Sequence, residues 1–328
     1  MSVALLRFSG KKERKKMKTF YKTVDNCVCE TEVYEQGCWM SVISPDKEEI
    51  DSLKHEYKID PTYISSSLDE EESSHIETED GFTFLTFDIP CVEKEDDNLI
   101  YNTSPIGVIV TPECVITIAK KDNPVLMDFE QGVVKNVQTA HKTRFVLLML
   151  FRMATRFLQY LKQIDKYSSN LESKLRRSMK NKELTQLLDL EKSLVYFQTS
   201  LNSNNTMIKK LARGKYLKLY EEDEDLLDDV SIEMAQAIEM CNIYASILSG
   251  TMDAFASVIS NNLNIVMKVL TSITIMMAIP TMVFSFYGMN TGSQAGGLPL
   301  AGFWLWPTLI ALAATVIVGI ILYKKDMF

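Results

Sequence analysis

Charged side chains are missing from the last part of the chain, where no Asp, Glu, Lys or Arg occurs between Lys268 and Lys324. A charge at the centre of a bilayer costs roughly 2.5–3.5 kcal/mol on insertion scales, so spanning segments exclude it. A charge-free run of this length therefore predicts a membrane region at the C-terminal end. The residues before it have the composition of a water-soluble protein.

Residues that carry chemistry are also scarce. The three histidines are far apart, and the sequence has neither a glycine-rich phosphate loop nor a nucleophile elbow. The six cysteines lack the spacing of a zinc site and fit a reduced cytoplasmic domain. A net charge of −8 argues against general binding of nucleic acid. We therefore expect no enzyme activity, no organic cofactor and no nucleic-acid partner.

Residues 20–141, which follow a basic N-terminal segment (1–19), predict a cytoplasmic α/β domain. Two β-rich runs joined by Pro112 and Glu113 predict a hairpin, and Asp46 can cap a helix. The β-rich runs span 38–43, 82–89, 106–111 and 114–119, and the helical candidates span 45–57 and 61–71.

Proline is absent between Pro124 and Pro280, so nothing forces a break in the long helical patterns of this region. The apolar run 145–151 is interrupted by Arg152 and Arg156, well short of the ~20 residues that a span needs, and predicts a buried helix face. An antiparallel helical hairpin is expected over 142–221. Its helices span about 142–180 and 182–212, and a third helix starts near Glu222.

Two membrane spans are predicted, at about 265–288 and at 303–323. They are joined by an uncharged loop, 291–302, and followed by a short tail, 324–328. Lys268, Lys324 and Lys325 all flank the spans on one side, so the positive-inside rule places both termini in the cytoplasm of a plasma-membrane protein.

A polar stripe runs along the first span and its upstream continuation. At 100° per residue, ten positions spaced three and four residues apart fall within a sector of about 120°. All of them are polar or small except Met267, whereas the rest of the span is dominated by large apolar residues. The ten positions are Asp253, Ser257, Ser260, Asn264, Met267, Thr271, Thr274, Ala278, Thr281 and Ser285.

Such a stripe must face another helix or water, because unsatisfied polar groups are costly in lipid. A tight helix–helix seam of small residues is one interpretation. A water-filled pore is the other. The stripe belongs to a helix of about 100 Å if residues 222–288 are unbroken at 1.5 Å per residue. It ends at an uncharged amide, Asn290, and two spans per chain cannot enclose a polar path, so several chains would each contribute one stripe.

The residues YGMN, Tyr287 to Asn290, close the first span and precede a short loop and a last span that ends in lysines. This arrangement resembles the CorA magnesium-channel family, whose Gly-Met-Asn motif matches Gly288, Met289 and Asn290. The resemblance covers the whole architecture and is most specific over 262–290. It implies an α+β membrane protein with a cytoplasmic α/β domain, a long stalk helix (222–290) beside a helical hairpin, two C-terminal spans and a funnel-shaped homopentamer.

The resemblance also implies roles for residues. The Gly-Met-Asn ring would be the selectivity filter, Asp253 an acidic ring in the stalk, and Asn264, Met267 and Thr271, with Leu270 beside them, the cytoplasmic-side gate. Mg²⁺ dehydrates reluctantly, and amide oxygens can accept hydrogen bonds from its water shell without stripping it. The expected pore-lining set is Asn264, Met267, Leu270, Thr271, Thr274, Ala278, Thr281 and Ser285.

Members of this family sense intracellular Mg²⁺ through acids between subunits, and Asp228, Asp229 and Asp88 are the candidates here, with solvated surface as the alternative. The family's outer loop often carries an acid after the motif, and loop 291–302 has none, so the choice among Mg²⁺, Co²⁺, Ni²⁺ and Zn²⁺ stays open. The expected function is a passive Mg²⁺ channel regulated by Mg²⁺. The alternatives are a zinc, cobalt or nickel transporter of the same superfamily, or a membrane-anchored coiled-coil adaptor.

Overall fold

The computed structural model describes residues 18–25, 27–79, 81–95, 98–178, 181–289 and 305–327. The basic N-terminal segment up to residue 17, Asn290 and the whole predicted outer loop lie outside these residues. Tertiary contacts divide the chain into two units, Met1–Ser249 and Gly250–Phe328. The division falls within one helix, α6 (Glu221–Tyr287).

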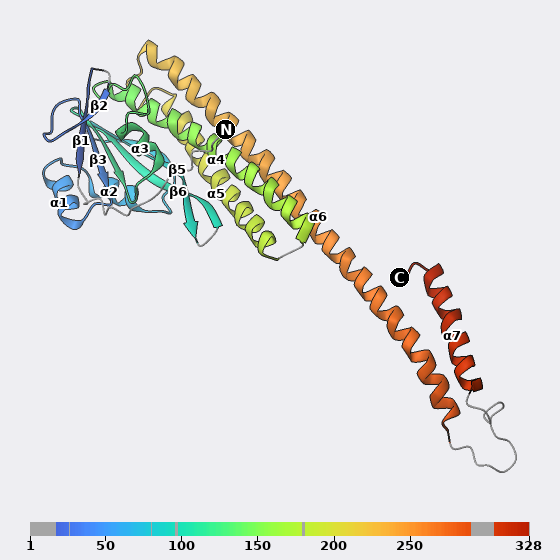
Figure 1. Cartoon of the computed structure of the whole chain (residues 1–328). Coiled ribbons are helices and arrows are strands. Elements are labelled where there is room, and N and C mark those ends of the chain that lie inside the picture. Colours follow the sequence, from blue (N-terminus) through green and yellow to red (C-terminus); the bar gives the residue numbers. More distant parts are fainter. Residues whose placement is uncertain are drawn as a thin grey trace. The chain divides into compact units, whose positions relative to one another are not determined.

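The first unit is built on a seven-stranded mixed sheet (Figure 1) with the strand order β2-β1-β3-β7-β6-β5-β4. Only β3 and β7 pair in parallel; the other neighbours are antiparallel. The predicted hairpin across Pro112 and Glu113 is confirmed as β6–β7, with Val110 opposite Val115. The strands are β1 (Thr19–Val24), β2 (Cys27–Thr31), β3 (Trp39–Ile43), β4 (His75–Glu79), β5 (Phe82–Glu95), β6 (Asn98–Val110) and β7 (Val115–Ala119).

Both faces of the central strands are covered, which explains why β7 is buried along its whole length. On one face Met40 and Val42 pack with Leu53 of α1 (Lys47–His55) and Tyr63 of α2 (Pro61–Leu68). On the other face the Trp39 ring lies 6.3 Å from Phe129 of α3 (Pro124–Glu130) and 5.4 Å from Phe145 of α4. The indole N–H of Trp39 donates to Thr117 Oγ1 at 2.9 Å, so this large buried ring has no unsatisfied donor.

The predicted helices of this unit are confirmed, with small shifts at their ends. The cap at Asp46 forms a full capping box with Glu49, and α2 starts at Pro61 as expected. The long helices are α4 (Lys142–Ser178) and α5 (Asn181–Leu211), and Gly214 adopts a positive φ of 69° in the turn after α5.

Three strands and one helix have no counterpart in the sequence predictions. Strands β1, β2 and β4 lie at or next to the sheet edges and are short, and none of them shows a regular alternation of buried apolar and exposed polar residues that would reveal it. Strands β5 and β6 are longer than expected because their polar ends, such as Cys91 opposite Asn102, continue the pairing. Helix α3 is short; Asn123 is its N-cap and Pro124 is its first residue.

The buried carboxylate of Asp128 explains the two arginines that interrupt the apolar run of α4. Asp128 Oδ2 accepts from Arg152 Nε at 2.7 Å and from Arg156 Nε at 2.8 Å, and Asp128 is 5% exposed. The apolar neighbours Phe145, Val146, Leu147, Met149 and Leu150 are buried, which confirms the predicted buried helix face.

Replacing Asp128 with alanine should therefore lower the free energy of unfolding by roughly 3 kcal/mol, because it leaves two guanidinium groups without their carboxylate. The measurement is equilibrium denaturation of the purified protein followed by circular dichroism. The matched control is Glu172→Ala, which removes a surface pair with Arg176 and should cost less than about 1 kcal/mol. Equal losses of unfolding free energy in the two variants would show that the pairs of Asp128 with Arg152 and Arg156 stabilise the protein no more than a surface pair does.

Candidate functional site

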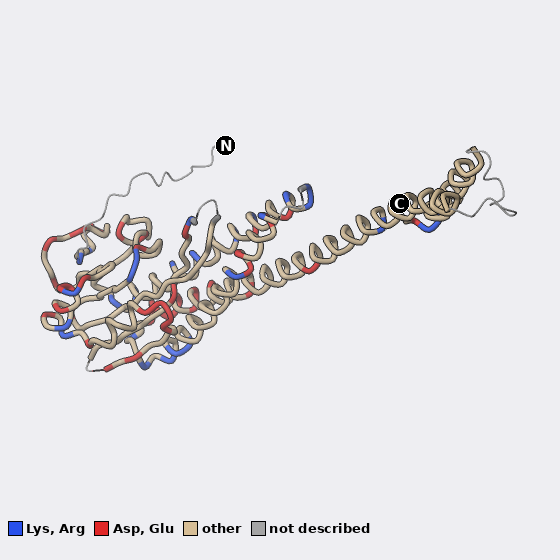
Figure 2. Tube along the Cα trace, turned by 90° about the horizontal axis from the view of Figure 1, so that it is seen from below, with Lys and Arg blue, Asp and Glu red and all other residues tan. Residues whose placement is uncertain are grey.

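The polar stripe lies on α6, which runs without interruption from Glu221 to Tyr287. Within the second unit the charged residues end at Lys268 and resume at Lys324. The C-terminal part of α6 and helix α7 (Leu305–Lys324) are therefore almost entirely tan in Figure 2, where charged residues are blue or red. Both helices are long and apolar enough to cross a membrane, and little of either apolar window is buried. Each therefore meets the length and hydropathy criteria for a transmembrane helix.

One face of α6 is partly covered within the chain, and that face is not the polar stripe. Ser272 Oγ donates to the carbonyl of Met327 at 2.9 Å, and a Cβ added to Gly319 of α7 would lie 3.7 Å from Met276 Cε. The partly or fully buried positions recur every three or four residues and include Val269, Ser272, Met276, Ile279, Val283 and Tyr287.

The predicted stripe is exposed along its whole described length. Its members on the second unit, Asp253, Ser257, Ser260, Asn264, Met267, Thr271, Thr274, Ala278, Thr281 and Ser285, are all solvent-exposed in the single chain, as is the neighbouring Leu270. On a helix of 100° per residue, the stripe and the partly buried face are centred roughly 145° apart. A helix–helix seam between α6 and α7 of one chain is therefore ruled out as the reason for the stripe.

The threonine hydroxyls of the stripe already have acceptors within the helix. Thr271 Oγ1 donates to Met267 O at 2.7 Å, Thr274 Oγ1 to Leu270 O at 2.8 Å, and Thr281 Oγ1 to Met277 O at 3.0 Å. Each hydroxyl oxygen keeps lone pairs that can accept a further hydrogen bond. The stripe thus presents acceptor oxygens rather than donors, which suits the water shell of a cation.

At the start of the predicted pore the stripe becomes apolar. Met267 is 52% exposed and Leu270 is 56% exposed, between Asn264 and Thr271. Apolar side chains that converge around a narrow aqueous path gate it by dewetting. The order along the helix is therefore an amide, then apolar side chains, then hydroxyls.

Helix α6 ends just before the Gly-Met-Asn motif. The Gly288 N–H donates to Phe284 O at 2.9 Å, and the Met289 N–H donates to Phe286 O at 3.4 Å. A Cβ on Gly288 would lie 3.1 Å from Phe284 O, so a larger residue there would crowd the last turn. Met289 is exposed, while Asn290 lies outside the described residues and its predicted role is not tested.

The predicted regulatory acids occupy different settings. Asp228 and Asp229 are exposed on α6, and Asp253 is exposed further along the same helix. Asp88 faces α5 instead: Ser200 Oγ donates to Asp88 Oδ2 at 2.5 Å, and burial raises the pKa of this carboxyl group. Among the described residues no group of three or more His, Cys, Asp or Glu side chains is arranged to hold a metal ion, so one chain does not bring these acids together.

The segment that leads into α6 is tied to the rest of the first unit, a feature that the sequence predictions missed. Thr83 Oγ1 donates to Tyr216 O at 2.9 Å, and Thr143 Oγ1 donates to Lys218 O at 3.0 Å. Arg144 donates to Glu222 O at 3.2 Å and lies 3.7 Å from the carboxylate of the buried Asp223. No local pattern could reveal these contacts, because they join residues that are 75 or more positions apart.

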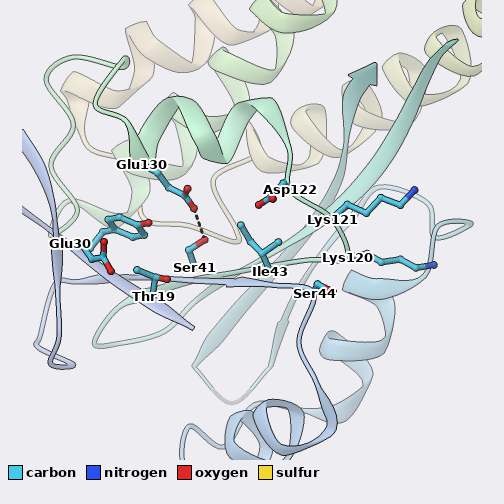
Figure 3. Close-up of a pocket in the computed structure, with 10 residues that line it drawn as sticks. Thr19, Glu30, Ser41, Ile43, Ser44, Lys120, Lys121, Asp122 and Glu130 are labelled. Atoms are coloured by element: carbon cyan, nitrogen blue, oxygen red, sulfur yellow. Dashed lines mark hydrogen bonds between the residues drawn. The ribbon is translucent and has the colours of Figure 1, made fainter. Parts of the chain in front are cut away.

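A separate hollow of about 470 Å³ lies where the parallel strands β3 and β7 end (Figure 3). Ser41 Oγ donates to Glu130 Oε1 across it at 3.2 Å. The lysines at its rim pair elsewhere, Lys120 with Glu70 at 3.3 Å and Lys121 with Glu93 at 3.1 Å. Both lysines of the hollow are thus engaged by acids outside it.

The chain is similar to known transport proteins over most of its length. It is 27% identical over 296 residues to the cobalt/magnesium transport protein CorA of Methanocaldococcus jannaschii, covering 86% of this chain and 89% of that protein. It is 21% identical to the magnesium transport protein CorA of Helicobacter pylori, covering 88% of this chain and 89% of that protein. The solved structure of the complete CorA magnesium transporter from M. jannaschii matches with a TM-score of 0.75 at 23% identity, over 94% of this chain and 96% of that one.

The family model described as CorA-like Mg²⁺ transporter protein matches residues 34–325. This range includes strands β3 to β7 of the sheet, the helical hairpin, the polar stripe on α6, the Gly-Met-Asn motif and α7. Two candidate membrane helices agree with the location of a transporter in a membrane. The chain therefore belongs to the family of CorA-like Mg²⁺ transporter proteins.

Proposed function

We propose that this protein is a passive, homopentameric channel that imports hydrated Mg²⁺ across the plasma membrane, with both termini in the cytoplasm. The observation that carries the proposal is the exposed polar stripe on α6, on the side of the helix away from the face that α7 partly covers. A single chain offers the stripe no cover. If it faced lipid, the acceptor lone pairs of its hydroxyl groups would have no donor, which is unfavourable in hydrocarbon. Several copies arranged around a common axis would instead enclose it as an aqueous path.

The stripe and the motif suit a cation that keeps its water. Mg²⁺ holds an octahedral water shell and loses it reluctantly. The hydroxyl oxygens of Thr271, Thr274 and Thr281 can accept from such a shell, and no carboxylate lies on α6 beyond Asp253 to retain the ion. A ring of Asn290 amides at the outer end would act as the filter. Conduction requires binding weak enough for release, and neutral oxygens meet this condition.

The relatives are named for both cobalt and magnesium, so the ion must be determined directly. The test is flux of Mg²⁺ and Co²⁺ into liposomes that contain the purified protein. Uptake driven only by the ion gradient supports the channel. A requirement for a proton gradient would point to a coupled transporter, and an absence of flux for every divalent ion would support a membrane-anchored adaptor.

The assembly can be measured independently of transport. If each chain supplies one stripe to a common path, the protein in mild detergent should have the mass of five chains, each of 37.3 kDa. Native mass spectrometry or light scattering gives this mass. A stable monomer or dimer would contradict the pore, because two stripes cannot surround a hydrated ion and still leave α7 on the lipid side.

Regulation by the transported ion is proposed to act at the head of α6, where nine acids lie between Glu221 and Glu239. The buried Asp223 is engaged by Arg144 and by the Tyr220 N–H, which leaves exposed acids such as Asp228 and Asp229 available. Two like charges 4 Å apart repel by about 4 kcal/mol at an effective dielectric of 20. Divalent ions bound between subunits by Asp228, Asp229 and the neighbouring subunit's acids, including Asp88, would offset this repulsion and favour the closed state.

The double variant Asp228→Ala, Asp229→Ala should relieve inhibition of flux by internal Mg²⁺ and weaken the protection of α6 from protease by Mg²⁺. Half-maximal inhibition should shift several-fold toward higher Mg²⁺. The control removes two exposed acids of α1, Glu48→Ala with Asp51→Ala, and should leave both properties unchanged. Unaltered inhibition and protection in the α6 variant would mean that these acids are ordinary surface.

A further inference from the structure

Two cysteines meet inside the sheet of the first unit. Trp39 of β3 lies beside Val115 of β7 in a parallel pairing, and Cys38 and Cys114 immediately precede these two residues. Both residues are buried, at 0% and 1% exposure, both are reduced, and both belong to the same core cluster on one face of the sheet. Adjacent strand positions have the Cα separation that a disulfide needs.

The surroundings of the two sulfur atoms differ. Thr111 Oγ1 lies 3.6 Å from Cys114 Sγ. The neighbouring Cys38 thiol, followed by the Thr111 hydroxyl, lowers the pKa of Cys114 against the opposing effect of burial. The neighbouring Cys114 sulfur, together with burial, raises the pKa of Cys38. Cys114 is therefore the sulfur of the pair that loses its proton more readily.

Cys114 also borders a route from solvent. It lines a hollow of about 510 Å³ with the aromatic rings of Tyr34, Tyr57 and Phe82. The charged groups around this hollow are Glu56, Lys58 and Glu113, and Glu113 Oε2 accepts from the Tyr34 hydroxyl at 2.5 Å. A small neutral molecule could reach the sulfur of Cys114 through this hollow.

Other buried cysteines of the chain lack this arrangement. The thiol of Cys241 donates to Leu194 O at 3.5 Å, and burial raises its pKa to about 12. Burial likewise raises the pKa of Cys91 to about 12. Burial therefore raises the pKa of these two thiols, and Cys114 differs from them in having a lowered pKa beside a second thiol.

We propose that Cys38 and Cys114 form a peroxide-sensitive dithiol, in which Cys114 is the attacking residue and Cys38 the resolving residue. The Cys114 thiolate attacks one oxygen of hydrogen peroxide, the O–O bond breaks, and a sulfenic acid and hydroxide form. The Cys38 sulfur then attacks the sulfenic sulfur and displaces its hydroxyl group as water, with loss of the Cys38 proton. In total two thiols and one peroxide give one disulfide and two waters.

The disulfide would link β3 to β7 beside the turn that anchors α4. Lys142 Nζ donates to the carbonyls of Thr111 at 2.9 Å and Pro112 at 2.7 Å, and Gly37 N–H donates to Glu113 O at 2.8 Å. The modification site thus lies at the junction of the sheet and the helical hairpin.

The test is peptide mapping of the full-length protein in detergent after treatment with hydrogen peroxide and alkylation of the remaining thiols. We expect a Cys38–Cys114 cross-linked peptide, lighter by two hydrogen atoms and restored by a reductant. The rate should rise with pH, because the thiolate is the attacking species. In Cys38→Ser the Cys114 sulfenic acid should accumulate and react with a dione probe, whereas Cys114→Ser should leave Cys38 unmodified.

Cys241→Ser is the matched control, because it removes a buried thiol that has only a carbonyl partner and should leave the cross-link unchanged. The exposed Cys27 and Cys29 report general oxidation in the same digest. If these two are oxidised while Cys38 and Cys114 are recovered as free thiols in the wild-type chain, the proposal is overturned and the pair serves only to fill the core. This measurement is made on the wild-type chain, so it does not depend on the folding of any variant.

Discussion

Replacing Asn290 with alanine is expected to reduce Mg²⁺ flux roughly a hundredfold or more while leaving the oligomer intact. Each amide that accepts from the ion's water shell contributes about 0.5–1.5 kcal/mol, and a ring of five loses all of them together. The substitution removes hydrogen bonds to the entering ion, and we expect it to leave the packing of the chain unchanged. Flux into liposomes and the mass in detergent, measured on the same preparation, separate the two effects.

Asn262→Ala is the matched control for the filter variant. Asn262 is an asparagine of the same helix, it is exposed, and it lies outside the polar stripe on α6. Its replacement should leave flux near the wild-type value. Near-normal uptake in Asn290→Ala would refute the filter and, with it, the interpretation of the motif as the narrowest selective point of a pore.

Thr274→Cys should make flux sensitive to a small, positively charged, water-soluble thiol reagent, with most of the flux lost after modification. Thr274 lies on the stripe and is exposed in the single chain, so in a pore its side chain meets water. A thiol reacts with such reagents as the thiolate, which requires water around it. A bulky cation attached there would both narrow the path and repel Mg²⁺.

The neighbouring residue supplies the control. Ile273 is 46% exposed, but it is rotated by about 100° from Thr274 on the helix and belongs neither to the stripe nor to the partly buried face. Ile273→Cys should face lipid and resist the same reagent. All six native cysteines precede residue 250, so the untreated background is measured on the wild-type protein. Block of both variants, or of neither, would contradict a pore lined by the stripe.

Much of the architecture could be predicted from the sequence because it depends on local or periodic signals. The absence of charge after Lys268 indicated the membrane region, and the absence of proline indicated long helices. The spacing of Thr271, Thr274 and Ala278 follows from the helix period and defines the stripe before any fold is known. These features require only neighbours within a turn or two of the same helix.

The tertiary structure decided what depends on distant partners. Strands β1, β2 and β4 exist because of the strands that they pair with, and their own sequences are too polar to reveal them. The tertiary structure also shows that the carboxylate of Asp88, a proposed ligand between subunits, accepts a hydrogen bond from Ser200 of α5 within its own chain.

The tertiary structure also decided which face of α6 is covered. Ser272 and Thr271 are adjacent small hydroxyl residues, and only the bond from Ser272 to the carbonyl of Met327 distinguishes the covered side from the open one. The helix period fixes which residues share a face. The choice between faces depends on the free energy of contact with a segment 55 residues further along the chain, and no local pattern contains that information.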